Sequence, residues 1–96
     1  MIVMIEDNSE YGFAIDFAPA GEAIAHCIIH KWTPSVCKRL MMNAIEVQRS
    51  LKKPLYAPRI NDKQEKFLRF MGFCPTQSLM VTTVGEVLPL FKMEVH

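Results

Sequence analysis

The stretch from Trp32 to Phe73 constrains the fold most, because it holds two helix starts and two helix stops around one short strand. Thr33 followed by Pro34 is typical of a helix start, with threonine as the N-cap and proline in the first turn. Apolar residues then recur at steps of four, four, three and four: Val36, Leu40, Ala44, Val47 and Leu51. This spacing predicts one apolar helix face, and Pro54 is expected to end the helix.

A short strand and a second helix are predicted next. Leu55–Ile60 is expected to be a strand, although a proline precedes it and another lies inside it, which limits the length that can pair. Asn61 is expected to cap the second helix, with Gln64 completing a capping box and Gly72 ending the helix. The buried side of this helix is expected to hold Phe67, Leu68, Phe70 and Met71.

Strands are predicted on both sides of this unit. Before it, strands at Met1–Ile5, Tyr11–Phe17 and Ala23–Lys31 are separated by short turn sequences, which predicts an antiparallel meander. After it, Ser78–Val84 and Val87–Val95 flank a glycine turn and are expected to form a hairpin. In the second strand one face is expected to be apolar: Tyr11, Phe13, Ile15 and Phe17.

The composition fits one small globular domain, residues 1–96, of mixed α/β (α+β) class. A net charge of +1 lacks the clustered basic surplus that nucleic-acid binding usually requires. Three cysteines without a CxxC pair indicate reduced thiols in the cytoplasm. The opening MIVMIED has no basic segment of a signal peptide, and no apolar stretch is long enough to cross a membrane.

Individual residues with chemical potential have plainer interpretations. His26 and His30 share a predicted strand face about 13 Å apart, too far to ligate one metal ion, although either could act as a general base in an active enzyme. Cys37 lies in the first helical turn beside Lys38 and Arg39, where a thiolate would be stabilised, but no base is identifiable and a packed thiol is favoured. No catalytic residue and no metal ligand is therefore predicted.

The order of elements and one local motif resemble the GNAT acetyltransferase superfamily. The motif is NDKQEKFLRFMGF, in which Asn61, the apolar pair Phe67-Leu68 and the pair Gly72-Phe73 correspond to residues found in many GNAT proteins. The resemblance is to a GNAT domain without its first strand and first two helices, such as the small GNAT-like proteins of tailed phages. It implies a truncated GNAT-like fold: antiparallel meander, long helix, strand, short helix and C-terminal hairpin.

The resemblance also implies a cofactor site, from which this chain departs. GNAT enzymes hold the pyrophosphate of acyl-CoA on backbone N–H groups at the start of the long helix, after a glycine-rich loop, as anion binding at a helix N-terminus requires. The corresponding segment, His30 to Arg39, contains no glycine, and Pro34 removes one N–H donor. If acetyl-CoA is bound, the expected cofactor-binding residues are Thr33, Ser35, Lys38 and Arg39.

A second departure concerns the general acid. Many GNAT enzymes use a tyrosine of the last-but-one helix to protonate the departing CoA thiolate, and the matching position here is Leu68. Tyr56 lies on the preceding predicted strand, which is a different place. The expectation is a GNAT-like protein without cofactor or acetyltransferase activity. The alternatives are an active acyl-CoA-dependent N-acetyltransferase with a divergent cofactor loop, and a small-ligand binder that uses the cleft between the two strand sets.

A protein partner or a homodimer is expected at the truncated start of the sheet. Without preceding elements the first strand would be an exposed apolar edge, and such edges tend to be paired or covered. Ile2 and Met4 are therefore candidate partner-binding residues, together with Trp32, which is either a packing anchor or an exposed interface residue. The resemblance to phage proteins implies a virion component or an inhibitor of a host defence system, in the virion or host cytoplasm, with no nucleic-acid or membrane partner.

Overall fold

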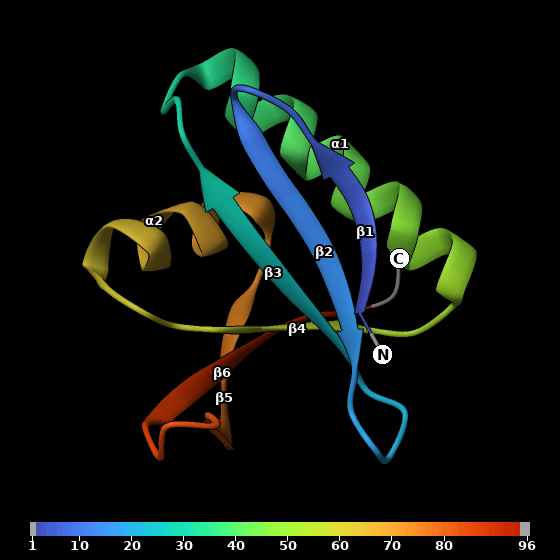
Figure 1. Cartoon of the computed structure of the whole chain (residues 1–96), viewed down its shortest axis with the longest axis vertical. Helices are drawn as coiled ribbons and strands as arrows, with labels where there is room; N and C mark the ends of the chain where they lie inside the picture. Colours follow the sequence, from blue (N-terminus) through green and yellow to red (C-terminus); the bar gives the residue numbers. More distant parts are fainter. Residues whose placement is uncertain (1, 95–96) are drawn as a thin grey trace.

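The computed structural model of the chain describes residues 2–94, which form a six-stranded sheet and two helices (Figure 1). The elements in chain order are β1 (Ile2–Asp7), β2 (Tyr11–Phe17), β3 (Ala23–Ile29), α1 (Pro34–Leu51), β4 (Leu55–Pro58), α2 (Asp62–Met71), β5 (Cys74–Val81) and β6 (Val87–Met93). The strand order across the sheet is β1-β2-β3-β4-β6-β5. This mixed α+β arrangement confirms the predicted fold class.

The sheet consists of two antiparallel halves that meet at one short parallel pairing. β1, β2 and β3 form the predicted meander, and β5 and β6 form the predicted hairpin, with β6 antiparallel to β4. β3 and β4 pair in parallel at two positions, Ala23 with Leu55 and Ile24 with Tyr56. Helix α1 makes the crossover that a parallel pairing needs.

One core lies between the sheet and the helices. The predicted apolar face of β2 is buried at Tyr11, Phe13 and Ile15, while Phe17 packs at its margin. The buried residues of α1 and α2 belong to this same cluster, so both helices cover one face of the sheet. In Figure 1, β1 and β2 cross in front of α1. Within residues 2–94 the opposite face has no helix over it.

Helix α1 begins and ends through its own backbone and cap residues. The Thr33 Oγ1 accepts a hydrogen bond from the Val36 N–H at 3.2 Å, as the predicted N-cap requires. At the other end Lys52 has φ 54°, and its N–H donates to the Gln48 carbonyl. The helix therefore ends at Leu51, three residues before Pro54, through a left-handed cap at Lys52.

The buried face of α1 differs from the predicted one at its C-terminal half. Val36, Leu40 and Ala44 are fully buried as predicted. The next fully buried residue is Gln48, one position after the predicted Val47, which is only partly buried. The fully buried residues of α1 are spaced by four, which is the line along which this helix meets the sheet. The sequence prediction chose Val47 in place of Gln48 because glutamine is polar.

Helix α2 confirms its predicted ends but not its whole buried face. The Asn61 Oδ1 accepts from the Gln64 N–H at 2.8 Å, and Gly72 has φ 99°. The Gln64 side chain accepts from the Ile60 N–H rather than from Asn61, so the predicted capping box is displaced by one residue. Phe70 is 59% exposed and its predicted burial is wrong. It lies about 100° around the helix from the centre of the stripe formed by Phe67, Leu68 and Met71.

Several strand ends differ from the predicted ones because pairing, and not hydrophobic pattern, sets them. Asp7 pairs with Gly12, which carries β1 past Ile5, and Cys74 pairs with Lys92, which starts β5 before Ser78. The other differences are listed together: β3 ends at Ile29 instead of Lys31, β4 at Pro58 instead of Ile60, β5 at Val81 instead of Val84 and β6 at Met93. The predicted ends at Met1 and Val95 lie outside the described residues.

Candidate functional site

An open groove of about 420 Å³ lies where α1 and α2 begin. Its walls are mostly apolar, and two lysines of α2 are among the residues that line it. The residues that matter below are Trp32, Pro34, Phe67, Phe70, Lys63 and Lys66. Lys63, Lys66, Phe67 and Phe70 share one side of α2 because they are spaced by three or four residues. The groove therefore combines apolar surface with positive charge.

Trp32 forms the boundary between this groove and the core. Its ring meets that of Phe67 edge to face, with 5.6 Å between the centroids. The Lys63 Nζ lies 4.5 Å from the centroid of the Trp32 ring, a cation–π contact. The side chain is still 41% exposed. Trp32 therefore packs against Phe67 and is also partly exposed. It has features of both interpretations of the sequence, the packing anchor and the exposed interface residue.

The start of α1 offers few free donors to an anion. The Thr33 N–H donates to the Lys31 carbonyl, and Pro34 has no N–H. The Val36 N–H is taken by the Thr33 side chain, and the Cys37 N–H begins the regular helical bonding. Among the N–H groups of the first turn, Ser35 alone has no acceptor within residues 2–94. Phosphate binding at a helix start relies on several such donors together.

The predicted cofactor-binding residues are not brought together around one space. Thr33 lines the groove, whereas Arg39 forms an ion pair with Glu10 and lies 6.0 Å from the centre of the Tyr11 ring. The hydrogen bond that Arg39 donates to the Glu10 carboxylate raises the pKa of the Arg39 guanidinium. Ser35 and Lys38 are exposed and do not line the groove.

The lysines that do line the groove, Lys63 and Lys66, were missed in the sequence. Their signal is a lysine at each of two positions three apart, followed by phenylalanines at 67 and 70. That pattern could have identified a mixed apolar and basic helix face. It could not have shown that this face meets the start of α1, because the two helices are joined only through the fold.

Beyond their short pairing, β3 and β4 separate, and the space between them is nearly filled. It has a volume of about 50 Å³, and the residues that line it include Cys27, Trp32, Ala57, Phe67 and Leu68. Burial raises the pKa of the Cys27 thiol to about 12. Leu68 is buried here, while Tyr56 alternates to the other face of β4, where the Lys92 Nζ lies 5.6 Å from its ring centre. No ionisable proton donor of α2 faces the gap.

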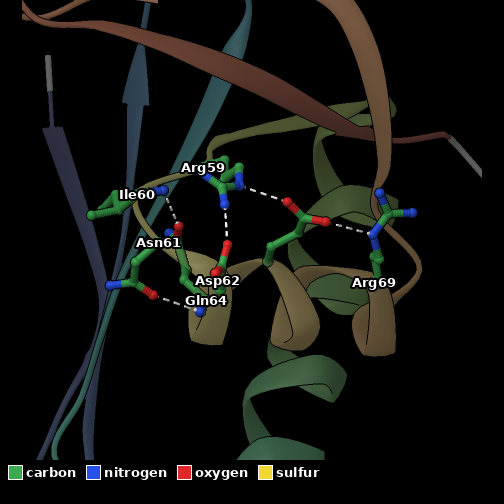
Figure 2. A network of polar contacts seen from close by, with 7 residues as sticks. Arg59, Ile60, Asn61, Asp62, Gln64 and Arg69 are labelled. Atoms are coloured by element: carbon green, nitrogen blue, oxygen red, sulfur yellow. Dashed lines mark hydrogen bonds and ion pairs between the residues drawn. The ribbon is translucent and has the colours of Figure 1, made fainter.

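A charged network fixes α2 against the end of β4 (Figure 2). The Arg59 Nε donates to one oxygen of Glu65 at 2.6 Å, and the Arg69 Nε donates to the other at 3.0 Å. Arg59 also pairs with Asp62. The hydrogen bond from Arg59, followed by that from Arg69, lowers the pKa of the Glu65 carboxyl. The groove beside Trp32 is therefore bordered by a helix whose first half is tied to the end of β4.

The two candidate histidines lie on the uncovered face of the sheet. His26 and His30 border a shallow groove there with Met4 and Ile28. Within residues 2–94 no group of three or more histidine, cysteine, aspartate or glutamate side chains is placed to share a metal ion. Neither of the helices in that range has the length and apolar character needed to cross a bilayer.

The candidate partner-binding strand is an edge strand. Among residues 2–94, β1 is the first strand of the sheet and pairs on one side, with β2. Its residues Ile2, Val3 and Met4 are 66%, 40% and 60% exposed. The predicted apolar edge is thus present, with Ile2 and Met4 at its surface, and Trp32 lies elsewhere, beside α2.

Comparison with known proteins supports the fold. No protein-family model matches the sequence, and a search of curated proteins found no significant match. A solved structure from Bordetella pertussis, described as a GnaT-family acetyltransferase, matches with a TM-score of 0.65 over 88% of this chain at 13% identity. This chain spans 57% of the length of that protein. The match shows a shared fold, and the chain has a GNAT-like fold.

Proposed function

We propose that this chain is a phage-type GNAT-like protein that acts by binding another protein and does not transfer acetyl groups. The observation that carries this proposal is the start of α1, where Pro34 and the Thr33 side chain leave one free N–H in the first turn. An acyl-CoA pyrophosphate carries several charged oxygens and needs several donors at that place.

Two further observations support the loss of chemistry. The space between β3 and β4 is about 50 Å³, room for one or two water molecules and not for an acyl chain. The position that matches the general-acid tyrosine is Leu68, which is buried and has no proton to donate.

The exposed edge of β1 supports the interaction role. An apolar edge strand with unpaired backbone groups is a common place for another chain to bind. In the phage setting that the resemblance implies, the partner would be a virion protein or a component of host defence, met in the virion or in the host cytoplasm. Ile2 and Met4 would contact it directly, and Trp32 would offer a second contact.

The second candidate function is an acyl-CoA-dependent N-acetyltransferase with a divergent cofactor loop. The observation that favours it is the groove at the start of α1, where Lys63 and Lys66 would attract phosphate groups and Trp32 and Phe70 would pack against apolar parts of a ligand.

Titration calorimetry with acetyl-CoA separates the two functions. The proposal expects no binding heat at millimolar acetyl-CoA. Micromolar binding that is lost in Lys63→Ala and Lys66→Ala, but kept in Lys92→Ala on the opposite side of the sheet, would overturn it and establish the acyl-CoA site. Lys63 and Lys66 are exposed and Lys92 is part-buried, so circular dichroism is used to verify that all three variants remain folded.

A further inference from the structure

The edge of β1 is continuous with a groove on the helix side of the sheet. The strand is six residues long, about 20 Å, and its outer side leaves backbone N–H and C=O groups unpaired within residues 2–94. An extended segment from another chain that pairs with this edge would extend the sheet by one strand.

A bulge in β1 turns an acidic residue toward this groove. Met4 pairs with Ala14 and Glu6 pairs with Phe13, so Ile5 is an extra residue of β1 that has no pairing partner in β2. Strict alternation would direct Ile5 and Glu6 to opposite faces, but both line the groove that faces α1. Bulges next to functional surfaces commonly redirect a side chain in this way.

The groove itself is apolar at its base and acidic at its margin. It has a volume of about 430 Å³ and lies between β1 and α1. Ile5, Val47 and Leu51 supply the apolar part, and all three pack on the main core. Glu6 and Glu46 supply two carboxylates. Within residues 2–94 Glu46 has no ion pair. Glu6 accepts a hydrogen bond from the Asn8 Nδ2 at 3.2 Å and attracts Arg39 at longer range, where the main partner of Arg39 is Glu10.

We infer that this groove and the β1 edge bind an extended segment of a partner protein in which an apolar residue and a basic residue stand two positions apart. Side chains two positions apart on a strand project to the same side, so two of them can enter the groove together. One is an apolar side chain that packs on Ile5, Val47 and Leu51. The other is a lysine or arginine that pairs with Glu6 and Glu46.

The charge of the groove argues against a second copy of this chain as the occupant. In a symmetric antiparallel pairing of two β1 strands over Ile2–Asp7, Glu6 and Asp7 of one copy would lie opposite Val3 and Ile2 of the other. Residues 2–7 of the second copy hold no lysine or arginine, so they would bring no basic side chain to Glu6 and Glu46. A basic partner neutralises the same groups.

This inference rests on the proposed function and names the chemistry of its partner. The probe is an acetylated and amidated hexapeptide in which valine and lysine take turns at every second position and threonine fills the positions between, added to ¹⁵N-labelled full-length protein. Titration is expected to shift the amide resonances of β1 and of residues 43–51 of α1. The affinity is expected to fall as salt is raised, because ion pairs at an exposed groove are screened.

Matched variants identify the groove. Glu46→Lys is expected to weaken peptide binding by about tenfold or more, the effect of replacing attraction with repulsion at a close charge pair. Glu86→Lys makes the same charge change in the exposed β5–β6 turn and is expected to leave binding unchanged. The same peptide with glutamate in place of lysine, and the lysine peptide with methylated backbone nitrogens on its pairing side, are expected not to bind.

Three results would overturn the inference: no shift of β1 amides at millimolar peptide, equal binding to wild type and Glu46→Lys, or a concentration-dependent dimer that Met4→Lys dissociates. The proposed function fails by a different observation, micromolar acetyl-CoA binding beside α2. Failure of the inference and failure of the proposed function are therefore distinguished by different measurements.

Discussion

At the scale of single residues, Gln48 connects the two ends of the core. It is buried, and its Nε2 donates to the carbonyls of Met93 and Glu94 at 2.7 Å each. Its Oε1 is buried without a partner. The side chain therefore ties α1 to the end of β6 by its donors alone.

Gln48→Met is expected to lower the free energy of unfolding by about 1–3 kcal/mol, because two carbonyls lose their shared donor. Gln48→Glu should cost more at pH 8 than at pH 5. A buried carboxyl that faces two carbonyl oxygens has a raised pKa, and a raised folded-state pKa means that stability is lost as pH rises. Urea unfolding followed by Trp32 fluorescence measures both effects.

The matched control for this prediction is Gln77→Glu, an exposed position on β5. Its unfolding free energy should respond little to the substitution at either pH. A Gln48→Glu protein with the same cost at pH 5 and pH 8 would show that the side chain escapes to solvent and does not bind the end of β6.

At the scale of elements, α2 is a short helix of 10 residues, and polar contacts at its start contribute much to its position. The Asn61 cap fixes its start, and the Arg59–Glu65–Arg69 network joins it to the end of β4. An isolated helix of this length is marginal in water, so these contacts and the packing of Phe67 determine where it lies.

Glu65→Gln is expected to remove a pH-dependent part of the stability. The two arginines lower the folded-state pKa of Glu65 below its ordinary value, so its contribution is present above the ordinary carboxyl pKa and is lost as pH falls through the lowered one. The wild type should therefore lose more stability than Glu65→Gln between pH 5 and pH 3. Thermal unfolding across that range measures the difference, and Glu86→Gln in the β5–β6 turn should behave as wild type.

The elements that could be predicted from sequence are those whose pattern and packing agree. β2 has its predicted bounds because it lies between two strands with one face in the core, so alternation is complete. The predicted start of β5, Ser78, lies four residues after the observed start, Cys74. The residues from Cys74 to Gln77 are mostly exposed, so their place in a strand depends on pairing with β6 and not on a hydrophobic pattern. The groove beside Trp32 depends on two helix starts meeting in space, which no local pattern encodes.

At the scale of the whole molecule, the junction of β3 and β4 is the narrowest connection between the two halves of the sheet. It has two paired positions, against seven between β2 and β3. Leu55 lies at this junction, fully buried, and also pairs with Met93 of β6. The halves are thus joined by side-chain packing around Leu55 and by α1 more than by backbone hydrogen bonds.

Leu55→Ala is expected to lower the free energy of unfolding by about 2–5 kcal/mol, because it leaves a cavity at a site with little freedom to close. Leu79→Ala, on the exposed surface of β5, should cost well under 1 kcal/mol. Since a domain of this size has roughly 5–15 kcal/mol in total, the milder Leu55→Val serves as a second variant that remains folded.

Amide hydrogen exchange distinguishes loss of the junction from general weakening. If the two halves depend on packing at Leu55, the valine variant should lose protection in β4 and β6 more than in β1 and β2, because local openings follow the least connected boundary. An equal loss in all strands would show instead that the sheet opens as one unit, and that α1, which packs on β2 and bonds through Gln48 to the end of β6, holds the halves together without help from the strand junction.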